Sequence, residues 1–182
     1  MQTFTEHPAL WVMLSMLSIA AVSDFRTGLI PNSVVAWGAA AGVVAQLSTA
    51  LLGEASLGLV LQRVGLGFVL GLALPLVLWG FGALGGGDVK LFAAIGVCVG
   101  PFPVLAIQLW AHVVALLIVP VQLLRSGNLL VTLQRSGRVL HNACVPKRLR
   151  KPIDPASFTS LRFAPAILLA AVWVCVLEES WP

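Results

Sequence analysis

The chain has 182 residues, of which 59% are hydrophobic and only 10% are charged. Because a soluble domain carries roughly 25% charged residues, this composition excludes an ordinary water-soluble fold and indicates an integral membrane protein. The net charge of +4 does not point to nucleic acid, since basic residues in a membrane protein report topology more often than partners. We expect one membrane-embedded domain over residues 1–182, the lipid bilayer as its surroundings, and no nucleic-acid partner.

Uncharged runs along the chain predict an all-α fold with about six transmembrane helices. No Lys or Arg precedes the first run, so we expect it to stay in the membrane rather than act as a signal peptide. Pro31 and Asn32 suit the start of the second helix. Gly67 and Gly71, in the third run, have the spacing of small residues at close helix contacts. The expected spans are 8–23, 33–52, 59–84, 89–100, 104–124 and 163–177.

The distribution of basic residues predicts the orientation. Segment 125–162 holds eight of the eleven Lys and Arg residues, so the positive-inside rule places it in the cytoplasm. If all runs cross and the N-terminus lies outside, only Arg63 is on the outer side, where its side chain can snorkel. A re-entrant fourth run would move the basic loop outside, so we expect a short crossing. Within this loop, residues 129–141 form either an interfacial helix on anionic lipid or a partly ordered loop, and both alternatives stay open.

Two aspartates, Asp24 and Asp88, stand out among the seven acidic residues. Two expected crossings separate them, and an even number of crossings returns the chain to the same side, so both lie at the cytoplasmic face. An ionisable group beside hydrocarbon is costly and is therefore a functional candidate. Two carboxyl groups held close share one proton and can divide acid and base roles, as in aspartic proteases.

This acid–base chemistry requires neither a metal nor an organic cofactor, and we expect neither. The three cysteines form no C-x-x-C pair, and the three histidines lie on different segments without the spacing of metal ligands. Gly85, Gly86 and Gly87 directly precede Asp88. Residues without Cβ let a substrate backbone come close to a catalytic oxygen and permit unusual dihedral angles. A flexible loop is the alternative interpretation of the three glycines.

Three motifs, in order, resemble those of the bacterial type IV prepilin peptidases, which are membrane aspartic proteases. "GGGDVKL" at 85–91 resembles their G-x-G-D-x-K-[LM] signature, "SDFRTGLIPN" at 23–32 resembles their other aspartate motif, and "RFAPAILLAA" at 162–171 resembles the motif opening their last helix. The resemblance implies Asp24 and Asp88 as the catalytic pair. It also implies supporting roles for the other motif residues, namely Gly85, Gly86, Gly87, Lys90, Arg26, Pro31, Asn32 and Pro165. Lys90 either favours the ionised form of Asp88 or is a snorkelling residue that helps to set topology.

The absence of C-x-x-C motifs and the early first span resemble the short, peptidase-only members found with tight-adherence (Flp-type) pili. The resemblance implies cleavage of leaders from Flp-type prepilins or pseudopilins in a bacterial inner membrane, without methyltransferase activity or S-adenosylmethionine. Two alternatives belong to other classes: a proton-linked transporter using the two aspartates as a relay, and a non-catalytic scaffold for pilus assembly. The sequence leaves the oligomeric state open.

Overall fold

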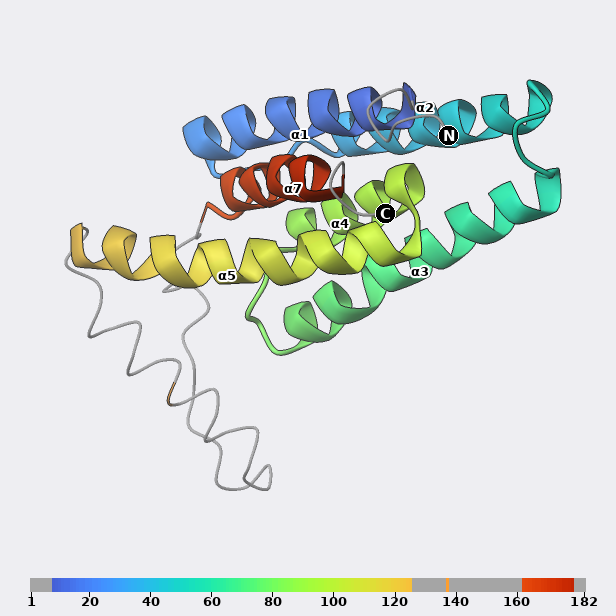
Figure 1. The fold of residues 1–182 in the computed structure, drawn as a ribbon. Coiled ribbons are helices and arrows are strands. Elements are labelled where there is room, and N and C mark those ends of the chain that lie inside the picture. The colour runs from blue at the N-terminus through green and yellow to red at the C-terminus, as the bar shows by residue number, and fades with distance from the viewer. Residues whose placement is uncertain (1–7, 126–136, 138–161, 179–182) are drawn as a thin grey trace. The chain divides into compact units, whose positions relative to one another are not determined.

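The computed structural model describes residues 8–125, 137 and 162–178. The chain divides into two compact units, residues 1–114 with 162–182 and residues 115–161, and the fold described below is that of the first unit. The described residues contain helices and no strand, which confirms the all-α expectation for this part of the chain. The helices are α1 (Pro8–Thr27), α2 (Asn32–Leu51), α3 (Leu57–Gly80), α4 (Gly86–Val99), α5 (Pro101–Arg125) and α7 (Ala164–Glu178) (Figure 1).

Four helices are long and apolar enough to cross a membrane: α1, α2, α3 and the part of α5 from Pro101 to Ile118. The other two are shorter, with 14 residues in α4 and 15 in α7. At about 1.5 Å per residue, such helices reach roughly 21–23 Å, less than the approximately 30 Å of a bilayer core. A multi-pass membrane protein is therefore confirmed, whereas six crossings and the orientation stay predictions. The segment 129–141, apart from Gly137, lies outside the described residues.

The helix ends near the two aspartates differ from the expectation. We expected the first helix to stop at Asp24 and the fourth to begin at Val89. Instead α1 continues to Thr27, and α4 begins at Gly86, so both aspartates lie inside helices. The hydropathy pattern shows where the run of apolar residues ends. The helix itself continues until Gly28, whose positive φ of 70° ends α1.

Helix α4 is the most enclosed element, because α1, α2 and α3 all contact it (Figure 1). It packs most closely against α3 through glycines. A Cβ added at Gly67 would lie 2.0 Å from the carbonyl oxygen of Gly96, and one at Gly71 would lie 2.5 Å from that of Phe92. The small-residue spacing of Gly67 and Gly71 is therefore the place where α3 and α4 bring their backbones together.

Proline 75 leaves a gap in the hydrogen bonding of α3 that α5 fills. Because Pro75 has no N–H, the carbonyl oxygen of Gly71, four residues earlier, loses its partner within the helix. The side chain of Gln108, which is 1% exposed, donates from Nε2 to the carbonyl oxygens of Gly71 at 3.0 Å and Leu70 at 3.1 Å. This contact fixes α5 against the middle of α3.

Side chains from two neighbouring helices satisfy the C-terminal end of α4. Gln46 of α2 donates to the carbonyl oxygen of Cys98, and Arg63 of α3 donates from Nη2 to that of Val99 at 3.2 Å. A cation at a helix C-terminus is favourable for the helix dipole. Gly100 has a φ of 88°, and a Cβ there would lie 2.8 Å from Cγ of Arg63. Arg63, expected only to snorkel toward headgroups, therefore bonds to the end of α4.

Candidate active site

Asp24 lies in the last turn of α1 and is only 5% exposed. Its Oδ2 atom accepts a 3.1 Å hydrogen bond from the backbone N–H of Ala164, the first residue of α7. Phe163 and Arg162 directly precede Ala164, and the Phe163 backbone and the positive charge of Arg162 also act on this carboxyl group. Because the first N–H groups of a helix have no partner within it, Asp24 caps α7 from a different helix.

Asp88 lies in the first turn of α4 and is 8% exposed. Its carboxyl group forms a hydrogen bond with the backbone of Gly85, the N-cap residue of α4. An acidic side chain reaching back from the third helical residue to the N-cap is a stabilising arrangement, because it satisfies a free N–H near the positive end of the helix dipole. Asp88 therefore has a structural partner of its own.

The fold brings the two aspartates into one buried region. Helices α1 and α4 are in contact, and the charge of Asp24 acts directly on the carboxyl group of Asp88. Burial of both groups removes the water that would otherwise screen their repulsion. Two carboxyl groups that act on one another in this way cannot both ionise easily.

The glycines before Asp88 have a different structural role from the one expected. Gly82 has a positive φ of 72°, whereas Gly85, Gly86 and Gly87 do not, so the expectation of unusual dihedral angles at these three was wrong. A Cβ at Gly85 would lie 3.0 Å from Oδ2 of Asp88, and one at Gly87 would lie 3.2 Å from Cβ of Ile30. Gly85 therefore leaves room for the carboxyl group. Gly87 leaves room for the segment leading into α2.

Lys90 connects the two aspartate motifs. Its Nζ atom donates a 2.9 Å hydrogen bond to Oδ1 of Asn32, the first residue of α2, whose N-cap is Pro31. This contact differs from both roles that the sequence suggested for Lys90. Arg26 lies exposed on the last turn of α1. Among these supporting residues, Lys90, Pro31 and Asn32 meet at the start of α2, and Arg26 does not join them.

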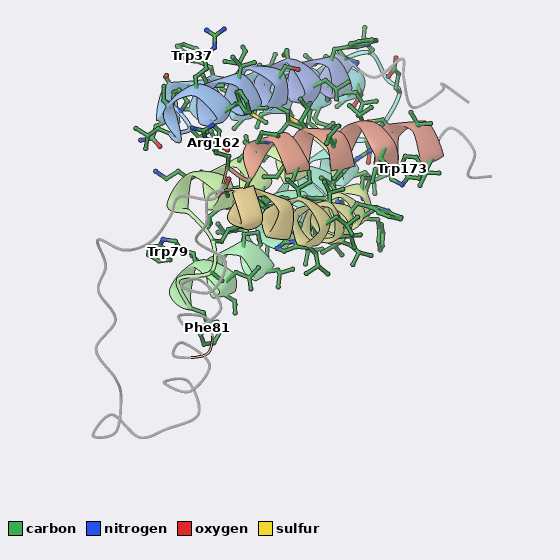
Figure 2. The ribbon with its side chains drawn as sticks, turned by 90° about the vertical axis from the view of Figure 1, so that its left-hand side faces the viewer. Trp37, Trp79, Phe81, Arg162 and Trp173 are labelled. Carbon is green, nitrogen blue, oxygen red and sulfur yellow. The ribbon has the colours of Figure 1, made fainter. Side chains whose placement is uncertain are left out.

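The sequence did not reveal that the backbone of α7 contacts Asp24. The motif "RFAP" marks this segment in the sequence, but the residue types do not show that a backbone N–H here bonds to Asp24. Arg162 lies over the ring of Phe25 at 5.3 Å, at the beginning of α7 beside the end of α1 (Figure 2). Phe163 packs against Phe92 of α4 and His112 of α5, with ring centroids 6.2 and 5.5 Å apart. These contacts hold the start of α7 beside the aspartates.

Within residues 8–125, 137 and 162–178, no three side chains of His, Cys, Asp or Glu are grouped so that they could hold a metal ion. Cys98 is buried on α4 as a free thiol. The carboxyl groups of Asp24 and Asp88 are side chains of a type that can transfer protons.

The fold and the site together define a multi-pass helical membrane protein with a buried pair of carboxyl groups. The model of the type IV leader peptidase family matches residues 11–120, and the chain belongs to this family. Membership makes the protein a membrane-bound protease of the leader peptidase kind, with prepilins as the implied substrates. The matched region contains both aspartate motifs, and the resemblance seen in the motifs is thereby confirmed. Comparisons with curated proteins and with solved structures found no significant match.

Proposed function

We propose that the protein is an aspartic endopeptidase that removes the N-terminal leader from type IV prepilins or pseudopilins, with Asp24 and Asp88 as its acid–base pair. The observation that supports this most is that two buried carboxyl groups from distant motifs lie on contacting helices and act on one another electrostatically. Family membership supplies the reaction class.

The proposed reaction uses one shared proton. The ionised carboxylate takes a proton from water, the water oxygen attacks the carbonyl carbon of the scissile peptide, and the neutral carboxyl donates its proton to the carbonyl oxygen. The carboxyl group that took the proton from water then gives it to the leaving nitrogen as the C–N bond breaks. At the same time the other carboxylate takes a proton from a hydroxyl group of the tetrahedral intermediate, which becomes the new carboxyl group of the leader. The products are the free leader and the mature pilin, and the pair again holds one proton.

We further propose that the site lies at the cytoplasmic face, with the N-terminus outside and all six described helices crossing, α4 as a short crossing. Trp79 and Phe81, at the end of α3 just before the glycine loop, are 53% and 58% exposed (Figure 2). Exposed aromatic rings, Trp above all, favour the boundary between lipid and water. Gly85 and Gly86 are exposed in the same region, so a substrate backbone could reach Asp88 from there. A prepilin anchored by its hydrophobic helix presents its leader at this boundary.

The substrate class that fits best is the Flp-type prepilin or pseudopilin of a bacterial inner membrane, cut after a glycine ahead of the apolar helix. This proposal rests on the likeness to short, peptidase-only members. It includes no methyl transfer and no S-adenosylmethionine. A co-encoded small protein with a basic leader, a glycine and an apolar helix would be the natural substrate to test.

The test is co-expression with such a prepilin and detection of leader removal by gel shift and mass spectrometry of the pilin N-terminus. Asp24→Asn and Asp88→Asn should each abolish cleavage, because either amide removes one half of the acid–base pair. The control is Asp154→Asn, in the basic segment, which should cleave normally. Normal processing by either active-site variant would overturn the proposal.

The same variants separate the other two classes. A non-catalytic scaffold would bind the pilin in pull-down experiments and leave its N-terminus uncut in the wild type. A proton-linked transporter would give proteoliposome flux that depends on Asp24. The location of both aspartates in end turns of their helices does not favour transport, since relay carboxylates lie near the middle of the bilayer.

A further inference from the structure

The two carboxyl groups have unequal surroundings. Asp24 faces the N-terminal end of α7, where the N–H of Ala164 donates to its Oδ2 at 3.1 Å. The backbone of Phe163, one residue earlier, also acts on this carboxyl group. Arg162 is the charged side chain that acts on Asp24 from the same element. All three belong to the segment that enters α7, and all three interact more favourably with a carboxylate than with a neutral carboxyl.

Asp88 lacks such a set of donors. The Gly85 backbone is its hydrogen-bond partner, and the charge that acts on it is the negative one of Asp24. The nearest cation in its own helix, Lys90, donates to Asn32. Repulsion from Asp24 and removal from water both disfavour a second negative charge at this position.

We propose that the first turn of α7 assigns the roles within the pair, so that Asp24 is the ionised base that deprotonates water and Asp88 is the neutral acid. The Ala164 N–H is then a positioning group: it orients Oδ2 of Asp24 and leaves Oδ1 as the oxygen that takes the proton from water. This inference depends on the proposed peptidase function and gives α7 a part in it. The groups that act on Asp24 are Ala164 at the start of α7, Phe163 and Arg162 just before it, and Asp88 of α4. His112 of α5 stacks on Phe92 beneath Phe163.

The proposal also explains why "RFAP" has a proline directly after Ala164. Pro165 has no N–H to satisfy and its φ suits the first turn of a helix. The N–H of Ala164 is therefore the donor that directly precedes Pro165, and the structure directs it to Oδ2 of Asp24. The start of α7 therefore lies where its free N–H can bond to the carboxylate of Asp24.

The decisive variants remove one N–H in two ways. An ester also weakens the carbonyl oxygen of Phe163, which accepts from the N–H groups of Ala166 and Ile167, so a proline variant that keeps this carbonyl as an amide is measured beside it. Replacing Ala164 by its α-hydroxy acid analogue converts the amide to an ester and deletes the donor without added volume. Ala164→Pro deletes the same N–H genetically at a position where proline is tolerated. Ala164→Gly is the matched control, because it keeps the N–H and adds no atoms to a site that is 0% exposed.

Cleavage of a prepilin-derived peptide would be followed across pH in detergent or nanodiscs. We expect the acid limb of the kcat/KM profile to move up by about one pH unit for the ester, because one hydrogen bond to a carboxylate stabilises its charge. KM should change little, and the glycine control should follow the wild type. A general packing defect would instead lower kcat at every pH and leave the acid limb of the kcat/KM profile at the wild-type pH.

The two proposals fail in different ways. If the ester variant cleaves the peptide with an acid limb at the wild-type pH, the assignment of roles is overturned while the peptidase function stands. If the wild type does not cleave, or Asp24→Asn does, the function itself fails. If the Ala164→Pro protein does not insert into the membrane, the ester variant decides whether the assignment of roles holds, because its backbone has the shape of the native one.

Discussion

Lys90 and Asn32 are 58 positions apart in the chain, yet Nζ of Lys90 donates a 2.9 Å hydrogen bond to Oδ1 of Asn32. The contact joins the start of α4 to the start of α2. Ile30 packs onto Gly87 beside it, with 3.2 Å between its Cβ and the position that a Cβ on Gly87 would occupy. The first turn of α4, which carries Asp88, is therefore held by the segment that follows α1, which carries Asp24.

The first prediction concerns this contact. Lys90→Met should reduce leader cleavage by about 3- to 10-fold, since the lost hydrogen bond involves a charged donor at an exposed position. Asn32→Ala should have a similar effect. The double variant should be no worse than either single variant, because both remove the same interaction. The measurement is kcat with a prepilin substrate.

Lys90→Arg is the control for this pair, because it retains the charge and can still donate to Asn32. Fully additive effects of the two substitutions would show that Lys90 acts through another group, for example on Asp88 itself.

The second prediction concerns the glycine contact between α3 and α4. Gly67→Ala places a methyl group 2.0 Å from the Gly96 carbonyl oxygen, where two backbones meet and neither can yield easily. We expect a loss of about 1–3 kcal/mol in the free energy of unfolding, with lower activity because α4 moves. Thermal unfolding in detergent measures it.

Gly65→Ala, two residues earlier on the same helix, is the matched control. A Cβ there meets nothing within 4 Å. It should leave stability unchanged or raise it by up to about 1 kcal/mol, because alanine is the better helix former. Equal losses for both variants would mean that α3 does not pack through Gly67.

The third prediction concerns the C-terminal end of α4. Arg63→Met removes the donor to the Val99 carbonyl oxygen while keeping a long apolar side chain. We expect a loss of about 1–2 kcal/mol in the free energy of unfolding, since a partly buried carbonyl loses a charged donor. The melting temperature in detergent reports this loss.

The neighbouring Gln62→Met, at an exposed position of the same helix, makes an equivalent polar-to-apolar change and should be neutral. Arg63→Lys should recover part of the lost stability. If Arg63→Met is neutral as well, the hydrogen bond to Val99 does not stabilise the fold, and Arg63 only snorkels on the outer side, as the sequence suggested.

Sequence alone determined the class of protein. Long apolar runs with few charges can be stable only as membrane helices, because each unsatisfied backbone group in lipid is costly. Counting the expected crossings between Asp24 and Asp88 predicts that they lie on one side of the membrane. The three motifs then identified the family, which the match over residues 11–120 confirms.

Tertiary structure decided what surrounds each of these residues. The hydropathy pattern shows where Asp24 interrupts an apolar run, but the N–H of Ala164, 140 positions later, can be matched to it only in three dimensions. The same holds for Arg63 at the end of α4 and for Gly85, which makes room for the side chain of Asp88. Hydropathy is a property of single residues along the chain, whereas capping and close packing depend on pairs whose distance the folded chain sets.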